Sequence, residues 1–366
     1  MSVFHAPAPP RRRWGFGVFP VARRPSPPTL AGEPALPDAA LFRRNVRLTI
    51  LDAVFINVTV GIHTTFLPIY ALELGAGAAE VGWLLALPAL VNVVLFLPAA
   101  QLVARRPARL PVAVRAAFFS RATYALLALL PWVVAEPVPW MIALTAYMSA
   151  PAAVAVVAWT ALIGDAFPEE RRSEVLGLRS AASGVSLTAT SLLAGPLLDL
   201  MPSPLNFSVL FLLAFAAAMG SLYFLHRMWE PVTEPAAPAP LREQLQSLLG
   251  EHRPFRAFSA GTLLLQLGIF IIAPLFPIYH VEHLGLSNST VGALTAVHWG
   301  AAVVGFWLFA RLARRRGNRP IYLAALLGLA AFPPLYLLSP HPLYLLVLNA
   351  GGGFLTAAYN LTLLNL

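Results

Sequence analysis

Ten long apolar runs divide the chain and restrict what it can fold into. Each run has roughly 20 mainly apolar residues, the length of a helix that crosses a bilayer. Only helices and closed barrels satisfy their backbone hydrogen bonds in lipid, and continuous apolar runs lack the alternation of barrel strands. The sequence therefore predicts an all-α polytopic membrane protein with spans near 48–72, 80–103, 112–134, 139–164, 177–200, 206–226, 257–280, 290–312, 319–338 and 342–364.

The composition agrees with this class and excludes several functions. Hydrophobic residues make up 58% of the chain and charged residues only 11%, whereas a soluble domain has about 25% charged residues. Without cysteine, neither disulfides nor Cys-ligated metals or clusters are available. Without lysine, an ATP-binding P-loop cannot form. No paired histidines or carboxylates resemble a metal site, so we expect no cofactor and no metal.

The arginines predict how the chain is oriented. Twenty-four of the 25 basic residues lie in the N-terminal segment or in the loops after the second, fourth, sixth and eighth spans. Cytoplasmic loops of membrane proteins are enriched in positive charge. We therefore expect a cytoplasmic N-terminus in the plasma (inner) membrane. The formal charge of +9 is then a topology signal, and we expect no nucleic-acid partner.

The spans fall into two groups with different flanks. Residues 1–41 are rich in Pro and Arg and predict a disordered cytoplasmic tail. Residues 42–226 hold six spans, the polar and Pro-rich stretch 227–256 predicts a cytoplasmic linker, and residues 257–366 hold four spans.

A weak internal repeat relates the two groups. Leu67-Pro68-Ile69-Tyr70 returns 209 residues later as Phe276-Pro277-Ile278-Tyr279. Arg105-Arg106-Pro107-Ala108-Arg109 returns at an offset of 210 as Arg315-Arg316-Gly317-Asn318-Arg319. The common order and nearly constant offset indicate a six-helix unit that is repeated in the same orientation.

The repeated loops resemble a motif of the major facilitator superfamily (MFS), G-x-L-A-D-R-x-G-R-R between the second and third helices. The second copy begins Leu312-Ala313-Arg314-Arg315, and the first begins Leu102-Val103-Ala104-Arg105. The motif's Asp is replaced by Ala104 and Arg314. Gly195-Pro196 is also similar to the glycine-rich antiporter motif of this superfamily, or it serves only close helix packing.

This resemblance implies an MFS-type fold of two six-helix bundles related by a pseudo-two-fold axis. About 10 of its 12 transmembrane helices are present. We expect a C-terminally truncated chain, with a genuine ten-helix protein as the alternative. The implied function is a secondary transporter, or permease, that moves a small molecule by alternating access. Efflux or uptake is undetermined, and proton coupling is one option.

Two other function classes stay open, a polytopic membrane enzyme that acts on a lipid-linked substrate and a non-transporting membrane sensor. An enzyme would need acidic or histidine clusters in the outward loops, which are short. We expect a monomer whose partners are the lipid bilayer and a small-molecule substrate.

Polar groups inside spans are costly in lipid and are therefore candidates for function. Asp52, Thr59 and His63 share one face of the first span and predict a proton or substrate site, or a helix cap and an ion pair with an arginine. The other pathway candidates lie on the helices that line the cavity in this family, or are related by the repeat: Asn57, Trp159, Thr160, Gln266, His298, Tyr359 and Asn360.

Charged groups at span ends are candidates for a cytoplasmic gate, or are simple helix-end charges. The resemblance implies that Asp165 forms a salt bridge with Arg105 or Arg106, and Arg315 and Arg319 are the related candidates in the second half. Arg121 is the one arginine assigned to the interior of a span, where a structural pair with Asp52 is expected.

Overall fold

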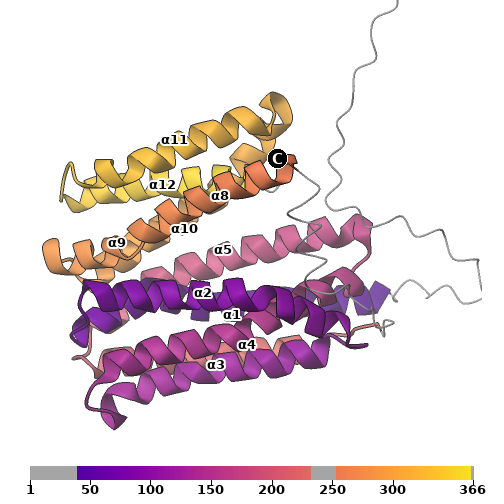
Figure 1. The fold of residues 1–366 in the computed structure, drawn as a ribbon, viewed down its shortest axis with the longest axis horizontal. Coiled ribbons are helices and arrows are strands. Elements are labelled where there is room, and N and C mark those ends of the chain that lie inside the picture. The colour runs from indigo at the N-terminus through magenta and orange to yellow at the C-terminus, as the bar shows by residue number, and fades with distance from the viewer. Residues whose placement is uncertain (1–38, 232–252, 364–366) are drawn as a thin grey trace, which may run out of the picture.

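The computed structural model describes residues 39–231 and 253–363, and every element within them is helical. Most of the tail predicted over 1–41 lies outside these residues, as does most of the linker. The first group comprises α1 (Ala39–Glu73), α2 (Ala78–Ala104), α3 (Leu110–Val133), α4 (Pro137–Ala166), α5 (Glu169–Asp199) and α6 (Leu205–His226). The second comprises α8 (Arg253–Ile272), α9 (Leu275–Ile278), the π-helical turn η1 (Tyr279–His283), α10 (Asn288–Arg316), α11 (Asn318–Tyr336) and α12 (Pro342–Leu363) (Figure 1).

The predicted spans correspond to these helices with one interruption. Eight of the described helices are long and apolar enough to cross a membrane, and the other two long helices are α8 and α11. The span predicted over 257–280 is broken, because α8 ends at Ile272 and the chain resumes as α9 and η1. Pro274 and Pro277 follow this end, and proline lacks the N–H that continues a helix.

The N half, α1–α6, is built around α1. This helix packs against α5 and α6, while α3 packs against α4 and α6, and α2 packs against α4. Buried polar side chains join these helices at α1: Thr59 donates to the Ala214 carbonyl of α6 at 2.9 Å, and Ser186 of α5 donates to the Val54 carbonyl at 2.7 Å. Such bonds suit a bundle in lipid, where helix association depends on packing and interhelical hydrogen bonds.

The start of the predicted linker is fastened to the N half. Asn45 of α1 exchanges two hydrogen bonds of 3.0 Å with the backbone of Trp229. The Glu230 carboxylate accepts from the backbone N–H groups of Arg109 and Leu110, the latter at 2.9 Å, at the start of α3. A carboxylate is favourable there because the first N–H groups of a helix have no intrahelical partner.

The C half, α8–α12, is joined to the N half mainly through α10. Within the C half, α12 packs against α10 and α11, and across the halves α10 lies along α5 (Figure 1). Small residues allow this approach. A Cβ on Gly195 of α5 would lie 2.8 Å from the Ser289 Cα, and one on Gly292 of α10 would clash with the Ser191 carbonyl. Gly195 therefore has a packing role.

Candidate functional site

The two ends of the helix bundle are packed differently. We call the end where α1, α3 and α5 begin the arginine-rich end, and the end where α1 and α5 finish the opposite end. At the opposite end, one apolar cluster includes residues of both halves, among them Phe66 and Tyr70 of α1, Ile278 of α9 and Val291 of α10. At the arginine-rich end, one cluster around Leu162 and Val175 belongs to the N half, and another around Ile321 and Tyr359 belongs to the C half.

Asp199 reinforces the closed opposite end. This last residue of α5 accepts hydrogen bonds from the backbone N–H groups of Asn288 at 3.2 Å and Ser289 at 2.9 Å, and from the Ser289 hydroxyl. It therefore acts as a cap supplied by the N half to the first turn of α10, where a negative charge is favoured. Asp199 was not among the candidates from the sequence, because its partners lie on a helix that is distant along the chain.

A cavity of about 320 Å³ lies beside the closed end and is lined by both halves. Thr64, Thr65 and Ile69 come from α1, whereas the facing wall comes from α9, η1 and helices α10–α12. The Thr65 hydroxyl is buried and has no hydrogen-bond partner among the described residues. On the facing wall, the Tyr336 hydroxyl lies 2.7 Å from the His280 Nε2 and accepts from the Asn349 amide at 3.0 Å.

A second cavity of about 700 Å³ adjoins the first. Both are lined by Phe276, His298 and Phe332, and the second extends to Tyr359 and Asn360 of α12. The Tyr359 hydroxyl is buried without a partner among the described residues. The structure thus brings three predicted candidates, His298, Tyr359 and Asn360, to one cavity. A fourth, Gln266, lies on α8, but its side chain is outside the described residues.

The predicted face of α1 points away from these cavities. Asp52, Thr59 and His63 do share a face, but this face packs against α3 and α6 inside the N half. The His63 ring meets Tyr124 of α3 edge-on at 5.8 Å, and its buried Nδ1 has no hydrogen-bond partner among the described residues. Thr64 and Thr65, which were not among the candidates, face the cavity instead. Helical spacing predicts which residues share a face but not which neighbour that face meets.

Asp52 is the centre of a buried charge cluster. Its carboxylate lies 3.1 Å from the Arg179 guanidinium of α5 and 3.9 Å from that of Arg121 of α3, and it accepts from the Ser221 hydroxyl of α6. Asp52 is 2% exposed. Four helices thus meet at one carboxylate. Arg179 is one of the arginines that were expected in the loop after the fourth span. It lies within α5 instead, so Arg121 is not the only arginine inside a helix of the bundle.

The remaining N-half candidates have contacts within the N half. Asn57 donates to the Ser183 hydroxyl of α5 at 2.9 Å. The Thr160 hydroxyl bonds back to the Val156 carbonyl of its own helix at 2.8 Å. The Arg179 guanidinium lies over the Trp159 ring, 4.3 Å from its centroid, which is a cation–π contact.

Asp165, the acidic residue of the expected gate, has a different partner. Asp165 pairs with Arg109 at 2.9 Å rather than with Arg105 or Arg106, which are exposed. The reason is geometric: Arg109 is the last residue before α3, and α3 packs against α4, which carries Asp165. The pair therefore lies within the N half. Arg315 and Arg319 are exposed at the arginine-rich end.

Comparison with known proteins identifies the fold. The family model of the Major Facilitator Superfamily matches residues 51–366. The chain belongs to this superfamily. No curated protein matches the sequence, so the subfamily stays unassigned. The predicted family, the all-α membrane fold and the function class of a secondary transporter are thereby confirmed, and the family points to a transporter rather than an enzyme.

Solved structures of transporters share the fold at low identity. A D-xylose–proton symporter is 12% identical, with a TM-score of 0.64 over 88% of this chain and 81% of that chain. A mutant form of the nucleoside transporter NupG is 12% identical, with a TM-score of 0.67 and the same coverage, 88% and 81%. A bacterial homologue of the human lysosomal transporter Spinster, inward-facing and unoccupied, is 16% identical, with a TM-score of 0.58 over 89% and 74%.

Proposed function

We propose that this MFS transporter moves a small molecule through the cavity between its halves, and that the described conformation is open at the arginine-rich end. The observation that carries the proposal is the position of the 320 Å³ cavity, which both halves line directly beside the cluster that closes the opposite end. In alternating access, the two bundles rock around such a central site. The arginines favour a cytoplasmic position for the open end, in the plasma membrane.

The cavity linings favour an uncharged substrate with an aromatic or apolar part. No Asp, Glu or Arg lies among the described residues that line either cavity. The polar groups are hydroxyls, amides and imidazoles, and they alternate with rings such as Phe276, Trp299 and Phe332. A charged ligand would lose its hydration there without gaining a counter-charge, whereas ring stacking with a few hydrogen bonds suits a partly apolar ligand.

We assign different roles to the candidates of the two halves. His298, Tyr359 and Asn360 contact the substrate, together with Thr64 and Thr65. Asp52, Asn57, Thr59 and His63 instead hold α1 to its neighbours and keep the N half rigid while it rocks.

A distance measurement tests the rocking motion. The chain has no cysteine, so spin labels can be placed on two engineered pairs, Ser173→Cys with Arg314→Cys at the arginine-rich end and Leu200→Cys with Glu282→Cys at the opposite end. In nanodiscs at several pH values, we expect the first distance to shorten when the second lengthens. Distances that never change, or that change together, would contradict alternating access.

A binding measurement tests the substrate class separately. Nicotinamide and nicotinate have the same ring but differ in charge. We expect a set of uncharged aromatic amides to quench the fluorescence of Trp299, and their carboxylate counterparts to have little effect. The Trp299→Phe variant is the control, since it removes the reporter from the cavity. Preferential quenching by the carboxylates would refute the assignment of an uncharged substrate and leave the rocking motion untouched.

A further inference from the structure

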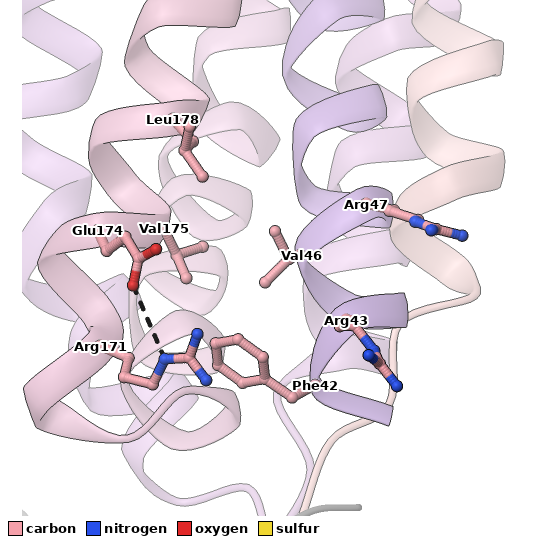
Figure 2. A pocket seen from close by; sticks show the side chains of 8 residues that line it. All are labelled: Phe42, Arg43, Val46, Arg47, Arg171, Glu174, Val175 and Leu178. Carbon is pink, nitrogen blue, oxygen red and sulfur yellow. Dashed lines mark ion pairs between the residues drawn. The ribbon is translucent and has the colours of Figure 1, made fainter. Parts of the chain in front are cut away.

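A basic groove lies outside the proposed transport path, between the first turns of α1 and α5 (Figure 2). It has a volume of about 220 Å³. Phe42 and Val46 of α1, with Val175 and Leu178 of α5, form apolar walls, and three arginines border them: Arg43, Arg47 and Arg171. Figure 2 shows Arg43 and Arg47 on one side of α1, away from the Arg171 guanidinium, which lies over the Phe42 ring at 4.1 Å.

The groove carries excess positive charge. Glu174 pairs with Arg171 at 3.7 Å, and both side chains are more than half exposed. Among the described residues, no carboxylate lies within ion-pair distance of Arg43 or Arg47. Two guanidiniums without a counter-charge thus project from α1 on the side away from Val175 and Leu178. A guanidinium matches phosphate oxygens through two parallel hydrogen bonds.

The same two arginines border a second hollow that continues toward the membrane. This hollow of about 520 Å³ lies along α1 and is lined by Arg43, Arg44, Arg47, Leu48 and Leu51. Arg44, Arg47 and Leu51 are spaced by three and four residues, so they form one stripe along the helix. Leu51 is 38% exposed. The stripe thus passes from guanidiniums to the exposed Leu51 within about two turns, which matches the change in polarity of a phospholipid from phosphate to acyl chain.

We propose that Arg43 and Arg47 form a binding site for the headgroup of an anionic phospholipid in the leaflet at the arginine-rich end. The headgroup phosphate lies between the two guanidiniums, and an acyl chain follows Leu48 and Leu51. Basic pockets between transmembrane helices are suited to such headgroups. The bound lipid lies along the first turns of α1, the helix that packs against α5 and α6, and it therefore stabilises the N half.

Native mass spectrometry tests this site on the whole chain. Protein is released from nanodiscs that contain phosphatidylcholine and phosphatidylglycerol, and retained lipids are counted. The Arg43→Gln/Arg47→Gln variant should bind phosphatidylglycerol about 25-fold more weakly, because each basic residue near an anionic headgroup contributes about fivefold in affinity. The matched control is Arg314→Gln/Arg316→Gln, which removes two exposed arginines of α10 at the arginine-rich end. This control should bind phosphatidylglycerol as the wild type does.

Two results would overturn the proposal. One is wild-type retention of phosphatidylglycerol by Arg43→Gln/Arg47→Gln, and the other is an equal loss in both variants, which would indicate attraction by net charge alone. The variant Arg43→Lys/Arg47→Lys keeps the positive charge at both positions. It serves as a second test in case the glutamine variant does not fold. Its affinity for phosphatidylglycerol should fall severalfold, because a lysine ammonium cannot form the two parallel hydrogen bonds that a guanidinium forms with phosphate. Equal binding by the lysine and glutamine variants would also contradict the proposed site.

Discussion

The opposite end of this bundle is held shut by contacts between its halves, whereas the apolar clusters and ion pairs of the described residues at the arginine-rich end stay within each half. At the opposite end, α1, α9 and α10 share one apolar cluster, and Asp199 caps α10. At the arginine-rich end, the Asp52 cluster, the Arg109–Asp165 pair and the Glu230 cap all belong to the N half. Exposed arginines project from both halves there, for example Arg171 and Arg314. Like charges oppose approach of the halves, while the sparsely charged end closes by packing.

The largest expected effect comes from the charge cluster that rigidifies the N half. Asp52→Ala leaves the Arg121 and Arg179 guanidiniums inside the bundle without their carboxylate. Breaking a buried pair in this way costs about 3–5 kcal/mol, and the free energy of unfolding in mixed micelles measures it. The control, Glu174→Ala, removes an exposed pair, where the loss is about 0–1 kcal/mol. Equal losses in the two variants would show that the cluster does not stabilise the N half.

The next effect concerns the contact between α5 and α10. In Gly195→Ala, the new Cβ would clash with the Asn288 carbonyl, so the opposite end has to open. We expect the free energy of unfolding to fall by about 1–3 kcal/mol, as for an overpacked core, and the Leu200–Glu282 spin-label distance to lengthen.

Gly177→Ala is the matched control for Gly195→Ala on the same helix. A Cβ on Gly177 meets no atom within 4 Å. Alanine should therefore stabilise α5 there by about 0.5–1 kcal/mol. If both substitutions lowered the free energy of unfolding equally, the inference that the two ends of α5 are packed differently would be wrong.

A smaller effect is expected at the cap of the closed end. Asp199→Ala removes three hydrogen bonds to the first turn of α10. Loss of a cap costs about 1 kcal/mol, so the population with a long Leu200–Glu282 distance should rise about fivefold. Asp199→Asn keeps an acceptor and should give an intermediate shift. An unchanged distance distribution in Asp199→Ala would mean that packing alone closes this end.

The smallest effect on stability is expected inside the cavity. Thr65→Val removes a buried hydroxyl that has no hydrogen-bond partner among the described residues. Replacing such a group by a methyl is nearly neutral or slightly stabilising, so the free energy of unfolding should change by less than about 0.5 kcal/mol. Quenching of Trp299 by an aromatic amide should weaken. A clear loss of stability would show that the Thr65 hydroxyl holds the helices together and does not serve the substrate.

The sequence alone determined the membrane class, nearly all the helices and the superfamily, because the length of an apolar run is set by the thickness of the bilayer and the repeated loop motifs are local. The exception was the break after Ile272, where prolines lie within an apolar run. The sequence also placed Asp52, Thr59 and His63 on one face, since that follows from 3.6 residues per turn.

Only the tertiary structure decided which neighbour each face meets. It turned Asp52 toward Arg121 and Arg179, gave Asp165 the partner Arg109 in place of Arg105 or Arg106, and made Asp199 a cap for a helix 89 residues away. These pairings depend on which helices pack together, and in lipid this choice rests on small residues such as Gly195 and Gly292. Glycines have no functional side chain, so the sequence does not indicate which helix they contact. Their partners are known only once the helices are placed side by side.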